Sequence, residues 1–404
     1  MSTPAMRALI DKAEQYIFPT YLRSPIVLTR GEGMRVWDSE GKEYLDFVSG
    51  IAVLNIGHRH PKVIEAIQKQ SAMLMHVSNL YYSEPQIRLA ELLVTHSFAD
   101  KVFFCNSGAE ANEAAIKLTR KFFKDRGEPH RFEIITMENS FHGRTLATLS
   151  ATGQRKFHHD FEPLLDGFRY APFDNARALE EAITEATCAV MVEPIQGEGG
   201  VNCPSPEYLK ALRTICDAHG LLLIFDEVQV GLGRTGTLFA YQHYGVEPDI
   251  MTLAKALAGG MPIGAMLAKK ECASSFSQGT HASTFGGNPL SAAAAVATLE
   301  VLLKDNILEN CQKMGEYFLA QLCSLKERYP AITKVKGKGL IVGIELAFPG
   351  ADIATECVKR GILINCTMGN ILRFIPPLII TRKEIDTLIH TLDELLNRIP
   401  LASS

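Results

Sequence analysis

The sequence lacks any apolar run long enough to cross a membrane, because segments such as residues 221–225 fall far short of the ~20 residues that a membrane helix needs. It also lacks a strong charge of one sign. The formal net charge is −4 over 404 residues, so neither nucleic acid nor a membrane is expected as a partner. The first 16 residues contain no uninterrupted apolar segment typical of a signal peptide. We therefore expect a cytoplasmic protein.

Cysteine is present, but not in an arrangement typical of disulfides or metal sites. Nine cysteines lie between Cys105 and Cys366 without a Cys-x-x-Cys pair, which favours reduced, buried thiols. Histidines cluster at residues 58–60, 141–143 and 158–159, but none of these clusters has zinc-type spacing with a second half-site. We expect no metal.

The composition is that of an ordinary globular protein, with 47% hydrophobic and 21% charged residues, and the length favours two packed domains. Short apolar runs alternate with amphipathic stretches, which predicts an α/β fold built on a largely parallel sheet. The expected strands are residues 101–105, 132–137, 189–192, 221–225 and 249–253. In such sheets, ligands bind beyond the carboxyl ends of the strands.

The pattern changes near residue 290. A helix is expected at residues 290–303, followed by shorter strands near 339–346 and 371–374, which indicates a smaller C-terminal domain. Near the N-terminus, residues 36–38 and 41–44 indicate short strands joined by a turn.

Asp226 and Lys255 carry the most chemical information, because each follows an expected buried strand and both should reach the same edge of the sheet. An ordinary ion pair is the alternative. However, Lys255 ends an apolar strand and precedes residues 256–260 (ALAGG), which predicts a poorly solvated amine with a lowered pKa. Such an amine suits Schiff-base chemistry with pyridoxal phosphate, whose ring nitrogen a carboxylate such as Asp226 would keep protonated.

An anion site is expected at Ser107, Gly108 and Ala109, where a strand passes through a glycine turn into a helix with an apolar face. Free backbone N–H groups, the Ser107 hydroxyl and the helix dipole would together bind a phosphate. Residues 231–236 (GLGRTG) match the dinucleotide fingerprint by letter, but they do not follow their strand directly and no acidic residue ends a second strand ~20 positions later. These glycines are therefore expected to shape a loop.

The chain resembles the class III aminotransferases over nearly its whole length. The motifs that carry the resemblance occur in the family's order: residues 106–113 (NSGAEANE), 141–144 (FHGR), 193–200 (EPIQGEGG), 226–229 (DEVQ), Lys255 and 283–289 (STFGGNP). The resemblance implies pyridoxal phosphate as cofactor and the type I aminotransferase fold, with a large, mainly parallel sheet domain and a smaller α+β domain. It implies that residues 1–57 and 300–404 form the small domain and residues 58–299 the large one.

The same resemblance assigns further cofactor contacts. Phe141 and Val228 would enclose the pyridine ring, and Gln229 would approach its 3-oxygen. Thr284 would reach the phosphate held by a neighbouring subunit, which implies a homodimer with shared active sites.

Within the family, the chain is most similar to the acetylornithine aminotransferase branch, on residues 50–53 (GIAV), 57–61 (GHRHP), 141–146 (FHGRTL) and 239–245 (FAYQHYG). This implies N-acetylornithine and 2-oxoglutarate as substrates. The branch typically has His142 where ornithine enzymes carry Trp.

The implied substrate-binding residues are Tyr21, Arg144, Glu198, Ser283 and Arg373. Arg144, with Tyr21 beside it, would bind one substrate carboxylate, and Arg373 the α-carboxylate of glutamate or 2-oxoglutarate. Glu198 would pair with Arg373 and move away when that carboxylate arrives, helped by the backbone freedom of its flanking glycines.

Other readings remain open. Succinylornithine, ornithine, diaminopimelate and 4-aminobutyrate enzymes share the same catalytic residues. A mutase or racemase that uses the same cofactor, or a non-catalytic protein that binds it, could also be built on this scaffold.

Overall fold

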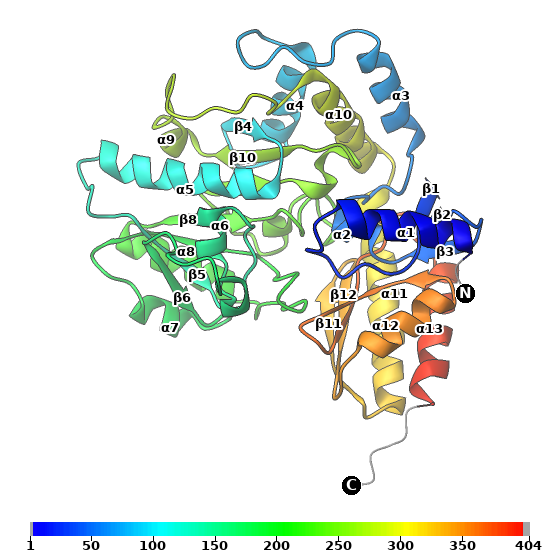
Figure 1. Cartoon of the computed structure of the whole chain (residues 1–404). Coiled ribbons are helices and arrows are strands. Elements are labelled where there is room, and N and C mark those ends of the chain that lie inside the picture. The colour runs from blue at the N-terminus through cyan, green and yellow to red at the C-terminus, as the bar shows by residue number, and fades with distance from the viewer. Residues whose placement is uncertain (1–2, 399–404) are drawn as a thin grey trace.

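The computed structural model describes residues 3–398 (Figure 1). A seven-stranded sheet has the strand order β4-β10-β9-β8-β7-β5-β6. Its strands are β4 (Lys101–Cys105), β5 (Glu133–Met137), β6 (Phe168–Ala171), β7 (Thr187–Val192), β8 (Leu222–Asp226), β9 (Ile250–Leu253) and β10 (Gly264–Ala268). Strand β10 is antiparallel to β4 and β9, and the other four pairings are parallel.

This sheet is covered on both faces, which explains why its strands are apolar at consecutive positions. Every residue of β7, β8, β9 and β10 is buried. Ile224 of β8 belongs to the hydrophobic cluster that contains α5 (Gly108–Asp125), whereas its neighbour Leu223 belongs to the cluster that contains α8 (Tyr208–His219). Successive strand residues therefore face opposite helical layers.

Two smaller sheets lie in the other half of the molecule (Figure 1). One has the order β1-β2-β3-β13 and the other β11-β12-β15-β14. Their strands are β1 (Leu28–Glu32), β2 (Arg35–Asp38), β3 (Glu43–Asp46), β11 (Ile332–Lys338), β12 (Ile341–Leu346), β13 (Ile362–Leu363), β14 (Asn365–Thr367) and β15 (Ile371–Phe374). Parallel pairing of β3 with β13 joins an N-terminal segment to a C-terminal one. The domain boundaries expected from the sequence stay a prediction.

The remaining helices complete the layers. They are α1 (Pro4–Tyr16), α2 (Ser49–Ala52), α3 (Pro61–Ser71), α4 (Glu84–Thr95), α6 (Leu146–Ala151), α7 (Ala176–Glu181), α9 (Lys270–Ala273), α10 (Pro289–Lys304), α11 (Ile307–Arg328), α12 (Ala351–Lys359) and α13 (Arg382–Leu396), with short 3₁₀ turns η1 (Arg155–Phe157), η2 (Ala240–His243) and η3 (Lys255–Ala258). Of the helices described, none is long and apolar enough to cross a membrane.

The expected elements are confirmed with small shifts at their ends. The expected strands at 101–105 and 371–374 coincide with β4 and β15, and the expected helix at 290–303 is α10. Strands β6 and β10 were not expected. The sheet is parallel except at β10, so the α/β expectation holds.

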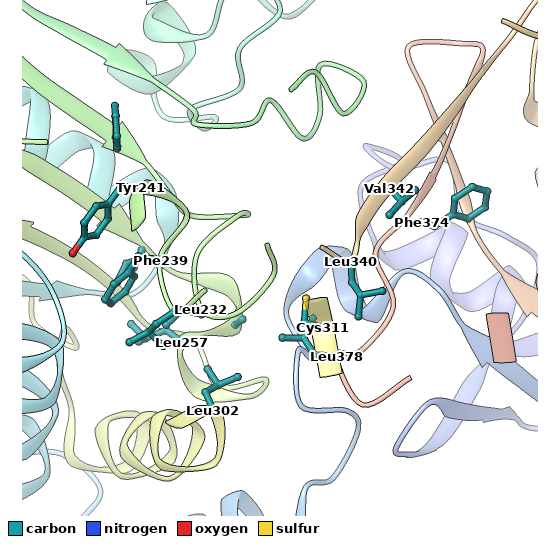
Figure 2. Packing of buried hydrophobic residues seen from close by; sticks show 14 of the residues in the cluster. Leu232, Phe239, Tyr241, Leu257, Leu302, Cys311, Leu340, Val342, Phe374 and Leu378 are labelled. Atoms are coloured by element: carbon teal, nitrogen blue, oxygen red, sulfur yellow. The ribbon is translucent and has the colours of Figure 1, made fainter. Parts of the chain in front are cut away.

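The glycines of residues 231–236 form a loop, as expected. Gly233 has φ +90, and a Cβ at this position would lie 2.8 Å from Leu378 Cδ1 and 3.3 Å from Leu302 Cδ2. The loop therefore packs tightly between α10 and the C-terminal part of the chain. Figure 2 shows Leu232, Leu257 and Leu302 on the left and Leu340 and Leu378 on the right. All five side chains belong to one hydrophobic cluster.

Arg234, in the same loop, is fully buried. Its guanidinium donates to the carbonyl oxygens of Leu340, at 2.9 Å, and Pro376, and to the side-chain oxygens of Ser49 and Asn55. Burial lowers the pKa of Arg234 to about 10. A single cation thus connects three distant stretches of the chain.

Replacing Arg234 should destabilise the protein without touching the cavity described below. We expect Arg234→Met to lower the free energy of unfolding by about 3 kcal/mol or more, because buried carbonyl groups lose their donors. Arg234→Lys should be intermediate, since it keeps the charge but not the planar fork. Arg177→Met serves as the surface control, because the Arg177 side chain is 88% exposed. Denaturant midpoints would decide, and an Arg234→Met midpoint equal to that of the Arg177 control would contradict the connecting role.

Candidate active site

A cavity of about 460 Å³ opens at the carboxyl ends of β8 and β9, the edge where parallel sheets bind ligands. Four loops and the start of α5 supply its lining. Of the residues singled out from the sequence, it is lined by Ser107, Gly108, Ala109, Phe141, Arg144, Glu198, Asp226, Val228, Gln229 and Lys255.

Lys255 follows β9 and begins η3. Its φ is +42, a left-handed value that is uncommon for a residue with a side chain and typical of functional sites. Lys255 reaches solvent only partly. Desolvation lowers the pKa of Lys255, although the carboxylates of Glu198 and Asp226 act in the opposite direction. The amine is therefore poorly solvated, as expected from the sequence, and its role as a nucleophile stays a prediction.

Asp226 ends β8 and is buried. Its Oδ2 accepts hydrogen bonds from Asn112 Nδ2 and His142 Nδ1, both at 2.8 Å, and its Oδ1 accepts from the Val228 backbone N–H at 3.0 Å. The carboxylate is thus held by three N–H donors while still lining the cavity.

The expected anion site has the predicted strand, turn and helix, but the Ser107 hydroxyl also caps that helix. Ser107 caps α5, and its hydroxyl accepts from the Glu110 backbone N–H at 3.2 Å. Gly108 and Ala109 lie in the first helical turn, where backbone N–H groups have no partner within the helix. A Cβ at Gly108 would lie 2.7 Å from Val228 Cγ1, so glycine is required for this close approach.

Arg373 is fully buried on β15, and its Nη1 lies 2.6 Å from Glu198 Oε1 and 3.2 Å from Gln229 Oε1. Burial alone would raise the pKa of Glu198, but the positive charges of Arg373 and Lys255 outweigh it, so this pKa lies below its usual value. Arg373 Nη2 has no hydrogen-bond partner among residues 3–398. This atom is thus a buried donor that the described side chains leave unpaired.

The glycines beside Glu198 do not provide the backbone freedom expected from the sequence. A Cβ at Gly197 would lie 1.8 Å from Gln229 Oε1, and a Cβ at Gly199 would lie 2.4 Å from the Asn139 carbonyl oxygen. The glycines are needed because the backbone is packed closely, so that expectation was wrong.

Arg144 lies at the exposed side of the cavity. Its guanidinium carbon is 3.8 Å from the centre of the Phe157 ring and 5.5 Å from that of Phe141, a cation–π arrangement. Within residues 3–398, no carboxylate lies within ion-pair distance of Arg144, which leaves its hydrogen-bond donors open to a ligand.

Besides Arg373, three of the expected residues lie outside the cavity lining. Tyr21 is 74% exposed, and Thr284 is also exposed. Ser283 Oγ accepts hydrogen bonds from Asn106 Nδ2 at 3.3 Å and from the Gly286 backbone N–H at 3.0 Å. The roles assigned to these three residues stay predictions.

Sequence reasoning missed the residues behind Asp226. Asn112 and Glu193 line the cavity but were given no role, and His142 was noted only for its place in a motif. Burial raises the pKa of Glu193 to about 7. One signal in the sequence could have indicated these residues: Asn112 is a polar residue within the apolar face of α5, one turn after the anion site.

The lining residues fit pyridoxal phosphate. An amine, a carboxylate, a helix N-terminus and the side chains of Phe141 and Val228 face one cavity, and these match the aldehyde, ring nitrogen, phosphate and ring faces of the cofactor. Other candidate chemistry is weaker. Burial raises the pKa of the Cys105 thiol to about 12, and residues 3–398 contain no cluster of three side chains suited to a metal ion.

Comparisons with known proteins identify the family. The family model "Aminotransferase class-III" matches residues 17–396. An acetylornithine aminotransferase of Caldanaerobacter subterraneus subsp. tengcongensis is 53% identical over 97% of this chain and 100% of its own length. One from Methanocaldococcus jannaschii is also 53% identical, over 96% of this chain and 98% of its own.

Solved structures of the same family have this fold. An ornithine aminotransferase from Toxoplasma gondii has a TM-score of 0.94 at 36% identity, covering 98% of this chain and 96% of its own. An acetylornithine aminotransferase from Elizabethkingia anophelis has a TM-score of 0.88 at 35% identity, covering 98% and 99%. These matches confirm the type I aminotransferase fold expected from the sequence. The chain belongs to the class III aminotransferases.

Proposed function

We propose that the protein transfers the terminal (δ) amino group of N-acetylornithine to 2-oxoglutarate, giving N-acetylglutamate semialdehyde and glutamate, a step of arginine biosynthesis. The observation that carries this proposal is the meeting of Lys255, Asp226 and Glu198 in one cavity, with the buried Arg373 bound to Glu198 behind the lining. Curated relatives named acetylornithine aminotransferase, 48–53% identical over almost the whole chain, support the choice of substrate.

Bound pyridoxal phosphate supplies an aldehyde that takes up an amino group and a ring that delocalises the electrons left when a carbon loses its proton. Lys255 would hold the cofactor covalently at rest. Once its amine is free, Lys255 would act as the general base on the carbon that carries the amino group, a role suited to its lowered pKa.

The other lining residues would position the cofactor. Asp226 would hold the ring nitrogen, Phe141 and Val228 would cover the two ring faces, and Gln229 would approach the 3-oxygen. The N–H groups at the start of α5, with Ser107, Gly108 and Ala109, would hold the phosphate.

Substrate binding would use the two arginines in different ways. Arg144, with Tyr21 and Ser283 nearby in the assembled protein, would bind the carboxylate far from the reacting carbon. Arg373 would bind the α-carboxylate of 2-oxoglutarate or glutamate after Glu198 leaves it. A substrate that lacks a carboxylate at the reacting carbon would leave the Arg373–Glu198 pair in place.

A homodimer with shared sites is part of the proposal. Thr284 lies at the surface, outside the cavity of its own chain, which is compatible with a contact to the cofactor phosphate of a second copy. The cytoplasmic location stays a prediction.

An amino-donor screen tests the proposed substrate. With 2-oxoglutarate as acceptor, N-acetylornithine should give the highest kcat/KM among N-acetylornithine, N-succinylornithine, ornithine and 4-aminobutyrate, with glutamate formed in equal amount. Lys255→Ala is the matched control and should show no turnover with any donor. A clear preference for another donor would replace the substrate assignment, and turnover without glutamate formation would indicate a mutase or racemase.

Glu198→Ala should change the two half-reactions in opposite directions, or change only one. Loss of the carboxylate leaves Arg373 unmasked, so single-turnover reaction with glutamate should become faster, while reaction with N-acetylornithine becomes slower or stays unchanged. Glu138→Ala is the control, because it removes a carboxylate that lies outside this cavity. An equal change for both donors would contradict the masking role.

Subunit mixing tests the shared site. Thr284→Ala chains and Lys255→Ala chains are prepared separately and then exchanged. If Thr284 serves the neighbouring chain's cofactor, each heterodimer contains one wild-type site and one doubly altered site. Activity should therefore rise on exchange above the sum of the two parents. No rise, with exchange verified by native mass spectrometry, would contradict shared sites.

A further inference from the structure

A chain of buried polar side chains lies behind Asp226. Thr252 of β9 pairs directly with Asp226 of β8 in the sheet, and its Oγ1 donates to Asn112 Oδ1 at 2.7 Å. Asn112 Nδ2 donates to Asp226 Oδ2 at 2.8 Å and to the His142 carbonyl oxygen at 2.7 Å. Thr252, Asn112, His142 and Asp226 are all buried.

The orientation of the Asn112 amide is determined by its neighbours. If its oxygen and nitrogen were exchanged, the amide oxygen would face a carboxylate oxygen and a carbonyl oxygen, which are both acceptors. Only the arrangement with Nδ2 toward Asp226 pairs every group. The Thr252 hydroxyl completes this arrangement, because it donates to the oxygen on the other side of the amide.

The same reasoning determines the tautomer of His142. Its Nδ1 faces Asp226 Oδ2 at 2.8 Å and must donate, since a carboxylate oxygen only accepts. Its Nε2 is buried and has no partner among residues 3–398. A proton on Nε2 would be a buried donor without an acceptor, which costs about 1–3 kcal/mol or more. With the proton on Nδ1 alone, Nε2 carries no hydrogen that needs an acceptor.

The backbone of His142 is also held at both ends. Its N–H donates to Thr152 Oγ1 at 2.9 Å, and its carbonyl accepts from Asn112. The backbone position of His142 is therefore fixed, and the ring is held at Asp226 by its own Nδ1 hydrogen bond. Glu193, the nearby acid, accepts from the backbone N–H groups of Phe141 and Gly197 instead.

We propose that Thr252, Asn112 and His142 are positioning residues that together fix the Asp226 carboxylate, with His142 in the neutral Nδ1–H tautomer. Because Asn112 and His142 occupy Oδ2, the remaining acceptor capacity of Asp226 lies mainly on Oδ1, which otherwise takes only the Val228 N–H. This inference rests on the proposed cofactor role of Asp226. Thr252 stabilises this orientation of the Asn112 amide without lining the cavity.

Thr252 allows a matched test in the cofactor-loaded enzyme. Thr252→Val keeps the side-chain shape and removes the hydroxyl, whereas Thr252→Ser keeps the hydroxyl. We expect Thr252→Val to lower kcat by roughly tenfold with little change in KM, because a small misplacement of a catalytic group is costly. Thr252→Ser should stay within about threefold of wild type, since its hydroxyl still reaches Asn112. Similar kcat values for the Val and Ser variants, at comparable Tm, would overturn the role of the hydroxyl.

The tautomer is tested on the cofactor-free protein by ¹⁵N NMR with labelled histidine. The His142 signals are identified by their loss in His142→Gln. In the wild type, Nδ1 should be protonated and Nε2 unprotonated, because Nδ1 faces the Asp226 carboxylate directly. A wild-type ring protonated on Nε2, or on both nitrogens, would overturn the proposal. This measurement needs neither substrate nor turnover, so its result is independent of whether N-acetylornithine is the donor.

Discussion

The withdrawal of charged groups from water at the carboxyl edge of the large sheet is the constraint on which the rest of the site depends. An unpaired buried charge costs several kcal/mol, so each such group needs partners supplied by the fold. Asp226 receives three N–H donors, and Arg373 contacts Glu198 and Gln229. These partners come from α5 and from the loops after β5, β7 and β8, so the site exists only when all of them are assembled.

The same requirement couples the two halves of the molecule. Arg373 lies on a strand of a smaller sheet, whereas Glu198 follows β7 of the large one. Arg234 makes a second connection, between the loop after β8 and the carbonyl groups of Leu340 and Pro376. The two arginines differ in chemistry. Arg234 is surrounded by neutral acceptors and acts as a structural link, while Arg373 has a carboxylate that a substrate carboxylate could replace.

Sequence reasoning predicted what short-range patterns encode. Strands β8 and β9 are continuous apolar runs, so their ends placed Asp226 and Lys255 at one edge. It missed β10 (Gly264–Ala268), which has no β-branched or aromatic residue and therefore gives a weaker strand signal. It also missed the contacts of Asn112, because a hydrogen bond to Asp226 spans 114 positions and depends on how α5 docks on the sheet. The sequence also did not show which glycines are closely packed. Gly197 and Gly199 suggest flexibility in a sequence but are tightly enclosed in the structure.

That enclosure restricts how Glu198 could release Arg373. Because the backbone at Gly197 and Gly199 has no space for a Cβ, a movement of the loop would disturb Gln229 and Asn139, so rotation of the Glu198 side chain is the less costly route. The glutamate side chain has three rotatable bonds and keeps some exposure to the cavity, with 28% of its surface accessible. Arg373 Nη2 has no partner among residues 3–398, but it is buried, so an incoming carboxylate would reach it only as the Glu198 carboxylate turns away. Binding would then proceed by exchange of one carboxylate for another, without an intermediate in which the buried guanidinium is left uncompensated.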